Sequence, residues 1–265
     1  MTTMEIAQAQ AASRILIRHW QDGTVLDALP PELRPSTRAG GYAIQARLEA
    51  TSARPLWGWK IAATSTAGQK HIGVDGPLAG RLLAEMTHED GATLALGANR
   101  MRVAEPEFAF RMGRDLPPRA QPYATEEVLA AVAALHPAIE VPDSRFADFA
   151  TVGAAQLIAD NACGHRFVLG PEAPAIWRDL DLAAHRVTGK VGDRILREGR
   201  GANVLGDPRL ALGWLANELS RHGVTLAAGQ VVTTGTCMVP LEIAAQDDVS
   251  ADYGALGRVG LRFGD

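Results

Sequence analysis

Two glutamates that are separated by one residue in an apolar stretch constrain the fold of this chain more than any other feature. In the segment Glu105-Pro106-Glu107-Phe108, an extended backbone places both carboxylates on one face and Pro106 and Phe108 on the other. The carboxylates then lie about 7 Å apart along the strand, at about 3.3 Å per residue. Two like charges on a buried face need a counter-charge. This face is therefore either solvated or occupied by a cation.

A third glutamate, Glu140, lies in the apolar run Ala138-Ile139-Glu140-Val141. A single acid inside such a run needs a partner. Carboxylate oxygens suit Mg²⁺ or Mn²⁺, and a site with few protein ligands leaves positions open for water and a chelating substrate. The acids Glu105 and Glu107 thus favour a site for a hard divalent cation, and Glu140 supports it. The alternative is a solvated sheet face.

The bulk properties exclude several classes of protein. The 265 residues are 47% hydrophobic and 21% charged, with a formal net charge of -4, which is typical of a globular protein and argues against nucleic acid as the main partner. No apolar stretch of about 18 residues indicates a membrane span, and the first residues do not resemble a signal peptide. The two cysteines, Cys163 and Cys237, do not suggest a disulfide framework. We expect a cytoplasmic protein that does not bind membranes.

Hydrophobic periodicity and turn residues predict the order of elements. Helices are expected over 4–20, 38–51, 126–135 (with Thr125 as N-cap) and from Pro208, after an N-cap at Asp207, to just before Gly223. Strands are expected over 56–62, 91–99, 165–169, 180–188, 194–198, 231–235 and 258–263, and a turn over 73–80. Strands dominate after residue 90 without regular helix alternation, which indicates an α+β fold. The helical segment 1–55 is expected to pack on a β-rich catalytic domain over 56–265.

Several segments of the chain together resemble the fumarylacetoacetate hydrolase superfamily, and within it the 2-keto-4-pentenoate hydratase and 4-oxalocrotonate decarboxylase group. The matching segments are Gly58-Trp59-Lys60-Ile61-Ala62-Ala63-Thr64-Ser65, Gly73-Val74-Asp75-Gly76-Pro77, Glu105-Pro106-Glu107-Phe108-Ala109-Phe110, Pro137-Ala138-Ile139-Glu140, Ala159-Asp160-Asn161-Ala162, Gly229-Gln230-Val231-Val232-Thr233-Thr234-Gly235 and Ala251-Asp252-Tyr253-Gly254-Ala255-Leu256-Gly257. The resemblance implies a mixed β-sandwich roll with a small helical N-terminal part, and Mg²⁺ or Mn²⁺ held by Glu105, Glu107 and Glu140.

The resemblance also implies an activity. A hydro-lyase of this group hydrates a 2-hydroxy-2,4-dienoate in the catabolism of aromatic compounds, and the metal chelates the acid and stabilises its enolate. Lys60 matches the active-site lysine, which pairs with the substrate carboxylate or moves protons, with a solvated strand lysine as the alternative. Gly235 and Thr236 resemble the loop that closes on the substrate carboxylate, or form a plain turn. The partner is thus a small 2-keto or 2-hydroxy-dienoate acid, and a homo-oligomer is expected, with possible association with a related decarboxylase.

Two positions that border the implied substrate site depart from the pattern of these hydratases. Leu78 stands where an acid is expected to pair with the lysine, and Cys163 replaces a serine, so that a weak thiol donor replaces a hydroxyl. The residues implied to bind the metal are kept, whereas the residues expected to deliver protons are changed. The alternatives to a hydratase are therefore a decarboxylase of a 4-oxalocrotonate-like acid, an acylpyruvate hydrolase, or a non-catalytic partner subunit with the same fold.

Overall fold

The computed structural model describes residues 3–264. Its α-helices are α1 (Thr3–Asp22), α2 (Arg38–Gln45), α3 (Thr66–His71), α4 (Thr125–Leu129), α5 (Ala154–Ala159) and α6 (Pro208–Arg221). Short 3₁₀ helices cover Pro31–Leu33, Ala46–Thr51, Ala84–Met86, Asn161–Cys163, Ala175–Arg178, Gly201–Asn203 and Gly254–Leu256. Helix α6 begins as its sequence predicts, because the side chain of Asp207 accepts a hydrogen bond from the Arg209 amide and Pro208 occupies the first turn.

The strands form two sheets. An eight-stranded mixed sheet has the order β2 (Leu78–Leu82), β1 (Gly58–Ala62), β10 (Val231–Thr236), β5 (Val103–Met112), β6 (Val132–Val141), β7 (Arg166–Leu169) and β3 (Thr87–Glu89), with β11 (Leu241–Glu242) paired to β5. A five-stranded sheet has the order β4 (Ala92–Ala95), β13 (Arg258–Gly264), β12 (Asp248–Asp252), β8 (Arg186–Val191) and β9 (Ile195–Arg200). Helices do not alternate regularly with strands along the chain. The expected α+β class is therefore confirmed.

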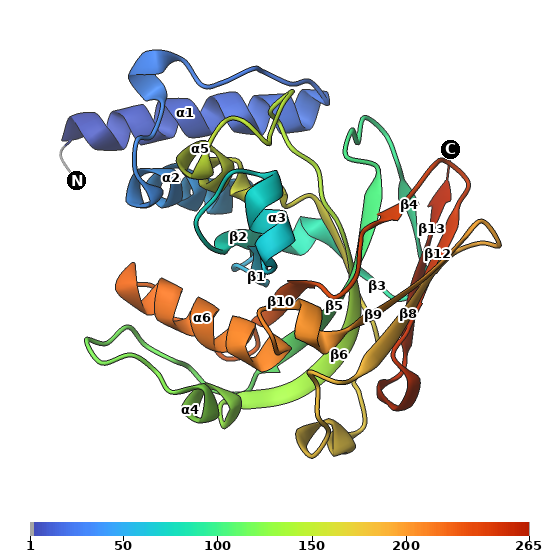
Figure 1. Cartoon of the computed structure of the whole chain (residues 1–265). Coiled ribbons are helices and arrows are strands. Elements are labelled where there is room, and N and C mark those ends of the chain that lie inside the picture. Colours follow the sequence, from blue (N-terminus) through green and yellow to red (C-terminus); the bar gives the residue numbers. More distant parts are fainter. Residues whose placement is uncertain (1–2, 265) are drawn as a thin grey trace.

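The main hydrophobic core lies between the two sheets and beneath α6. It joins Phe108 and Phe110 of β5 to residues such as Val187 and Val259 of the five-stranded sheet. Helices α1, α2 and α5 gather at the opposite end from the five-stranded sheet (Figure 1), around a small separate core that includes Leu16. The 146–159 segment contributes to this helical part, and the division of the chain at residue 55 stays a prediction.

Four expected elements are wrong in their extent. The expected helix over 126–135 ends at Leu129, Ala124 rather than Thr125 is its N-cap, and strand β6 begins at Val132. The expected turn over 73–80 contains the start of β2. The expected strand over 91–99 is limited to β4, and the expected strand over 180–188 begins only at Arg186. In the first case an alanine-rich run that favours a helix becomes a strand from Val132 on, because it pairs with β5 and belongs to a strand that is buried along most of its length.

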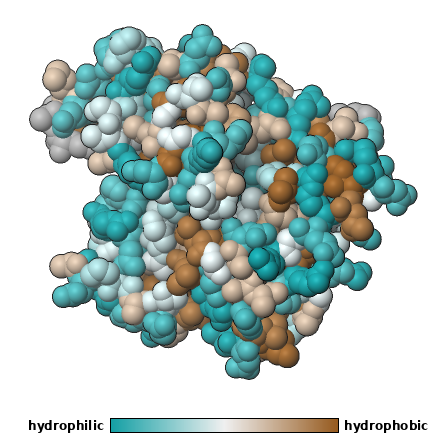
Figure 2. Space-filling view, viewed as in Figure 1, coloured by the Kyte–Doolittle hydropathy of each residue, from teal (hydrophilic) through white to brown (hydrophobic). Residues whose placement is uncertain are grey.

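The surface that Figure 2 shows is mostly hydrophilic, with hydrophobic residues in separate small areas. Large exposed hydrophobic side chains include Leu196 and Val239. Within residues 3–264, every helix is too short or too polar to cross a bilayer.

A buried acid on α6 connects three elements. The Tyr42 hydroxyl donates to Glu218 Oε1 at 3.0 Å and accepts from the Ala79 amide at 3.2 Å, and Arg221 donates to Glu218 Oε2. Burial alone raises the pKa of Glu218, but its interactions with His222, Arg221 and Tyr42 outweigh burial and lower the pKa to about 2. The charged form of Glu218 is therefore the one that the fold stabilises.

This lowered pKa predicts a specific dependence of stability on pH. The pKa falls from its usual 4.5 to about 2, so ionised Glu218 contributes about 3 kcal/mol that is fully present above pH 4.5 and is lost as the pH falls toward 2. Glu218→Gln should lower the free energy of unfolding at pH 7, and the difference from wild type should shrink over that window. Denaturant titrations at pH 7, 4.5 and 3 measure it. The exposed Glu126→Gln serves as control, and a difference that is constant with pH contradicts the prediction.

Candidate active site

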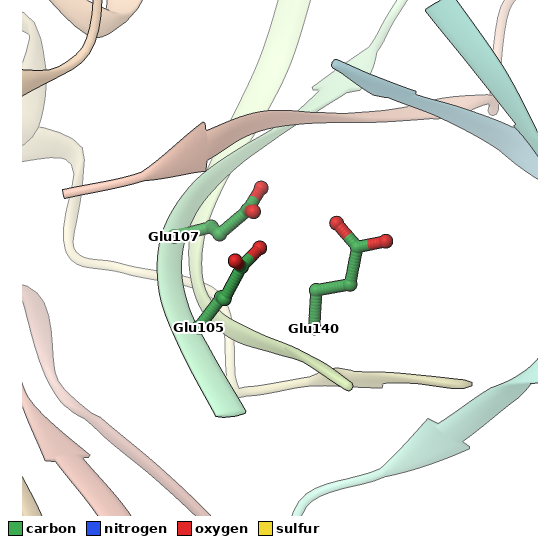
Figure 3. Close-up of side chains that lie close together, drawn as sticks. All are labelled: Glu105, Glu107 and Glu140. Atoms are coloured by element: carbon green, nitrogen blue, oxygen red, sulfur yellow. The ribbon is translucent and has the colours of Figure 1, made fainter. Parts of the chain in front are cut away.

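The three glutamates converge from two neighbouring strands. Strands β5 and β6 are antiparallel, and their register places Glu105 opposite Glu140 and Glu107 opposite Ala138. Side chains directly opposite each other, or two residues apart on one strand, share a face of the sheet. The carboxylates consequently point toward one another (Figure 3), and one ligand oxygen from each lies within 4.8 Å of the others.

The donor set fits a divalent cation. Glu107 and Glu140 are buried, with 0% and 1% of their surface exposed, while Glu105 is partly exposed. Among the described residues, Glu107 Oε1 and Glu140 Oε2 are buried without a hydrogen-bond donor, and Glu140 Oε1 has only the Lys60 ammonium, at 3.1 Å. Buried carboxylate oxygens are costly unless something satisfies them, and three converging oxygen donors with open positions suit a hard cation.

Burial and mutual repulsion perturb these acids strongly. Burial and the charge of Glu140 raise the pKa of Glu105 to about 7, against the opposing effect of Lys60. Burial, followed by the charges of Glu140 and Glu105, raises the pKa of Glu107 well above its usual range. The protein alone therefore does not stabilise three carboxylate charges at this point, and a bound dication would do so.

Lys60 lies at the same site, on strand β1. Its ammonium Nζ is 3.1 Å from Glu140 Oε1 and donates to the Ala162 carbonyl oxygen at 2.7 Å, and only 2% of the residue is exposed. Burial alone lowers the pKa of Lys60, but the charges of Glu140 and Glu105 outweigh it and raise the pKa. The alternative of a solvated strand lysine is thus wrong, while a role in catalysis stays a prediction.

A glycine on β2 makes room for the lysine side chain. Gly80 pairs with Lys60 across the two strands, and a Cβ atom at Gly80 would lie 2.5 Å from the Asn161 carbonyl oxygen and 2.8 Å from Lys60 Cδ. Both contacts are too short for an ordinary van der Waals distance. The absence of a side chain at Gly80 therefore leaves room for the Lys60 side chain and for the Asn161 carbonyl oxygen.

This packing predicts the effect of a methyl group. Gly80→Ala should displace Lys60 or the facing carbonyl, destabilise the fold by about 1–3 kcal/mol and lower kcat about tenfold or more. The matched control is Gly76→Ala, because a Cβ atom at Gly76 meets nothing within 4 Å. Thermal unfolding and steady-state kinetics measure both variants. Equal behaviour of the two variants would contradict the role given to Gly80.

The four residues expected at the substrate lie around this centre. The register places Leu78, which is fully buried, on the same face of β2 as Gly80, next to Lys60. The Cys163 thiol is buried, and burial together with the charge of Asp160 raises its pKa to about 12, which favours a packed thiol over a nucleophile. The Gly235 amide donates to Glu107 Oε2 at 2.7 Å, and the Thr236 hydroxyl donates to the Met238 carbonyl at 2.9 Å. Their contact with substrate stays a prediction.

Sequence reasoning missed two residues that hold Glu107. The Thr233 hydroxyl donates to Glu107 Oε2, and the Tyr253 hydroxyl donates to the Glu107 carbonyl oxygen at 2.7 Å from the five-stranded side of the core. Side chains two residues apart on a strand share a face, so Thr233 lies on the same face as Gly235, which was expected at the site. The sequence therefore contained a signal for Thr233. Tyr253 lies 146 residues away in sequence and had no such signal.

Fold and site together define a β-roll of one family, with an acidic centre that could hold a divalent metal ion. Residues 84–263 match the fumarylacetoacetate (FAA) hydrolase C-terminal family, and the chain belongs to it. The 2-keto-4-pentenoate hydratase 1 of Dechloromonas aromatica (strain RCB) is 35% identical over 268 residues, which cover 99% of this chain and 100% of the relative. The 2-hydroxyhexa-2,4-dienoate hydratase of Comamonas testosteroni is 33% identical over 82% of this chain and 81% of its own length. The expected relationship to these hydratases is confirmed.

The solved structure of 4-oxalocrotonate decarboxylase from Pseudomonas putida G7, complexed with magnesium and adipate, is also similar. Its TM-score is 0.88 at 25% identity, over 99% of this chain and 98% of the other. The same decarboxylase has been solved with calcium and acetate, at a TM-score of 0.86. The expected fold is therefore confirmed over nearly the whole chain, and the bound divalent ions of this neighbour agree with an acidic metal site.

Proposed function

We propose that this protein is a metal-dependent hydro-lyase that hydrates a 2-hydroxy-2,4-dienoate in the catabolism of aromatic compounds, with Mg²⁺ or Mn²⁺ bound by Glu105, Glu107 and Glu140. The observation that carries the proposal is the convergence of three carboxylates, of which two buried oxygens, Glu107 Oε1 and Glu140 Oε2, lack a hydrogen-bond donor among the described residues. The hydratases that are at least 30% identical over most of the chain support the substrate class.

The chain's own residues supply binding, orientation and proton movement. When bound, the dication would supply Lewis-acid stabilisation of the negative charge on the 2-oxygen. Thr233 and Gly235 fix the Glu107 carboxylate by hydrogen bonds. The Lys60 ammonium, held by Glu140 and the Ala162 carbonyl, is placed to pair with the substrate carboxylate or to carry a proton. Loss of the 2-hydroxyl proton and protonation of the far end of the diene together give an α,β-unsaturated ketone, to which water then adds.

A direct assay tests hydration. Purified protein with Mg²⁺ or Mn²⁺ should remove the diene absorbance of 2-hydroxypenta-2,4-dienoate, and a chelator should stop the reaction until metal is restored. Comparison of the two ions at equal occupancy identifies the better cofactor. If calorimetry shows bound metal and the absorbance does not change, hydration of this substrate is rejected.

Decarboxylation of a 4-oxalocrotonate-like acid is the second candidate. Leu78 provides no acid beside Lys60, and decarboxylation needs stabilisation of the enolate but not the proton relay of a hydratase. The decarboxylase of similar fold supports this alternative. Release of carbon dioxide from 4-oxalocrotonate, without loss of 2-hydroxypentadienoate, would favour it. A protein that binds metal and oxalate but turns over none of these acids or an acylpyruvate would be a non-catalytic partner subunit.

The remaining expectations stay predictions. A homo-oligomer, association with a related decarboxylase and a cytoplasmic location are supported only by the resemblance and by the composition. Light scattering of the purified protein, alone and mixed with such a decarboxylase, measures the first two.

A further inference from the structure

The turn that touches Lys60 has an unusual backbone. Asn161, Ala162 and Cys163 have φ values of 57°, 49° and 61°, so three successive non-glycine residues adopt the left-handed region. Side chains make this region uncommon, and such conformations persist only where the surroundings impose them. The Ala162 carbonyl oxygen at the middle of this turn accepts the hydrogen bond from Lys60 Nζ at 2.7 Å.

The Asn161 side chain ties the turn to the edge of the eight-stranded sheet. Its Oδ1 accepts from the Arg81 amide at 2.6 Å, and its Nδ2 donates to the Arg81 carbonyl oxygen at 2.8 Å. Strand β2 lies at the end of the sheet order, so within residues 3–264 its outward backbone groups have no neighbouring strand. The Asn161 amide satisfies both groups of Arg81 as the peptide of a further strand would, and Asn161 is only 3% exposed.

The two ends of the turn are tied to the chain that follows Glu140. Arg145 donates to the Asp160 carboxylate and to the Gly164 carbonyl oxygen. The Asp143 amide donates to the Cys163 carbonyl oxygen at 2.9 Å. Because residues 143–145 directly follow β6, these bonds fix the turn relative to the strand that carries Glu140, and Asn161 fixes it relative to β2.

We propose that Asn161 is a positioning residue, whose side-chain amide holds the left-handed turn on β2 so that the Ala162 carbonyl keeps the Lys60 ammonium beside Glu140. The turn approaches β2 closely: a Cβ atom on Gly80 would lie 2.5 Å from the Asn161 carbonyl oxygen. A small movement of the turn therefore changes the place of Ala162. The consequence for turnover rests on the proposed function, whereas the placement of Lys60 does not.

The chain offers a matched control for this role. Asn217, on α6, also pairs its side chain with both backbone groups of one residue, accepting from the Tyr123 amide at 2.7 Å and donating to the Tyr123 carbonyl oxygen at 3.0 Å. None of the described hydrogen bonds of Asn217 involves Lys60 or the three carboxylates. Asn161→Ala and Asn217→Ala thus each remove such a pair of bonds, and Asn217→Ala also removes a hydrogen bond to the Gly213 carbonyl oxygen.

The first measurement reports the position of the lysine without any substrate. The chain contains three lysines, Lys60, Lys70 and Lys190, and labelling by an amine-reactive reagent, followed by peptide mass spectrometry, compares them within one sample. In Asn161→Ala, labelling of the buried Lys60 relative to Lys70 and Lys190 should rise by about tenfold or more, because the ammonium is released from its site. In Asn217→Ala the ratio should equal that of wild type.

The second measurement is steady-state hydration. Asn161→Ala should lower kcat by about 100-fold, with KM changed by about threefold at most, because a misplaced group loses catalytic geometry rather than substrate affinity. Asn161→Asp keeps the acceptor for the Arg81 amide and should give a smaller loss. If Asn161→Ala does not fold, the labelling ratio of Asn161→Asp alone decides: a ratio above wild type supports the proposal, and an unchanged ratio overturns it.

The outcomes separate this inference from the proposed function. A folded Asn161→Ala protein with wild-type Lys60 labelling overturns the positioning role. An equal rise in Lys60 labelling in Asn217→Ala also overturns it, because the effect would then be general loosening. If wild-type protein hydrates no dienoate but Asn161→Ala still exposes Lys60, the positioning role stands and the proposed function fails.

Discussion

The substitution Glu107→Gln is expected to lower kcat for dienoate hydration by about a thousandfold or more and to remove the rise in Tm that Mg²⁺ or Mn²⁺ causes in the wild-type protein. Glu107 is fully buried and supplies one of the three converging oxygens. An amide is neutral and a weaker ligand for a hard cation. Kinetics at saturating metal and thermal unfolding with increasing metal measure the two effects.

The same variant should fold normally without metal. Glutamine has the shape of glutamate, and its side-chain oxygen can accept the hydrogen bonds that Thr233 and Gly235 donate to Glu107. We therefore expect the free energy of unfolding of the metal-free protein to change by about 1 kcal/mol at most. Glu89→Gln, an exposed glutamate on strand β3 of the same sheet, is the control. A Glu107→Gln protein that keeps both turnover and the metal-dependent Tm would remove the basis of the proposed function.

The second large effect is expected for Lys60→Met, which should lower kcat by about 10² to 10⁴-fold. Methionine fills similar space but carries no charge, so it can neither pair with the substrate carboxylate nor move a proton. Lys190→Met is the matched control, because Lys190 is also a strand lysine but is exposed on β8. Steady-state kinetics of both variants with saturating metal measure the difference.

Loss of Lys60 also affects stability. The Lys60 ammonium lies 3.1 Å from a Glu140 oxygen, and removal of one partner of a buried ion pair costs about 3–5 kcal/mol. Circular dichroism should therefore establish that Lys60→Met is folded before kinetics are interpreted, and added metal should recover part of the lost Tm. Near wild-type turnover by a folded Lys60→Met protein would show that the ammonium takes no part in the reaction.

Local patterns were enough to predict the residues that converge. Alternation along single strands places Glu105 and Glu107 on one face and Phe108 on the other. In the same way it places Lys60 on the face that Trp59 and Ile61 do not share. These predictions depend only on the period of two of an extended chain, which needs no knowledge of what packs against it. The N-terminus of α6 was predictable for a similar reason, because Asp207 and Pro208 act within one turn.

Other local patterns pointed to the wrong structure. The alanine-rich segment before Glu140 favours a helix by intrinsic propensity, but from Val132 it forms β6, which is buried between β5 and β7. Propensity differences of a few tenths of a kcal/mol per residue are smaller than the gain from pairing and burial in a central strand. The residues adjacent in sequence do not show that strand pairing and burial outweigh helix propensity here.

The sequence by itself determined the family, the three acids, the lysine and the faces of the strands on which they lie, because each depends on residue type and on spacing of a few positions. Only the tertiary structure decided which oxygens remain without a donor, that Gly80 makes room for Lys60, and that Asn161 closes the edge of β2 from 80 residues away in the chain. These features depend on contacts between distant segments, and side-chain periodicity carries no information about which segments meet.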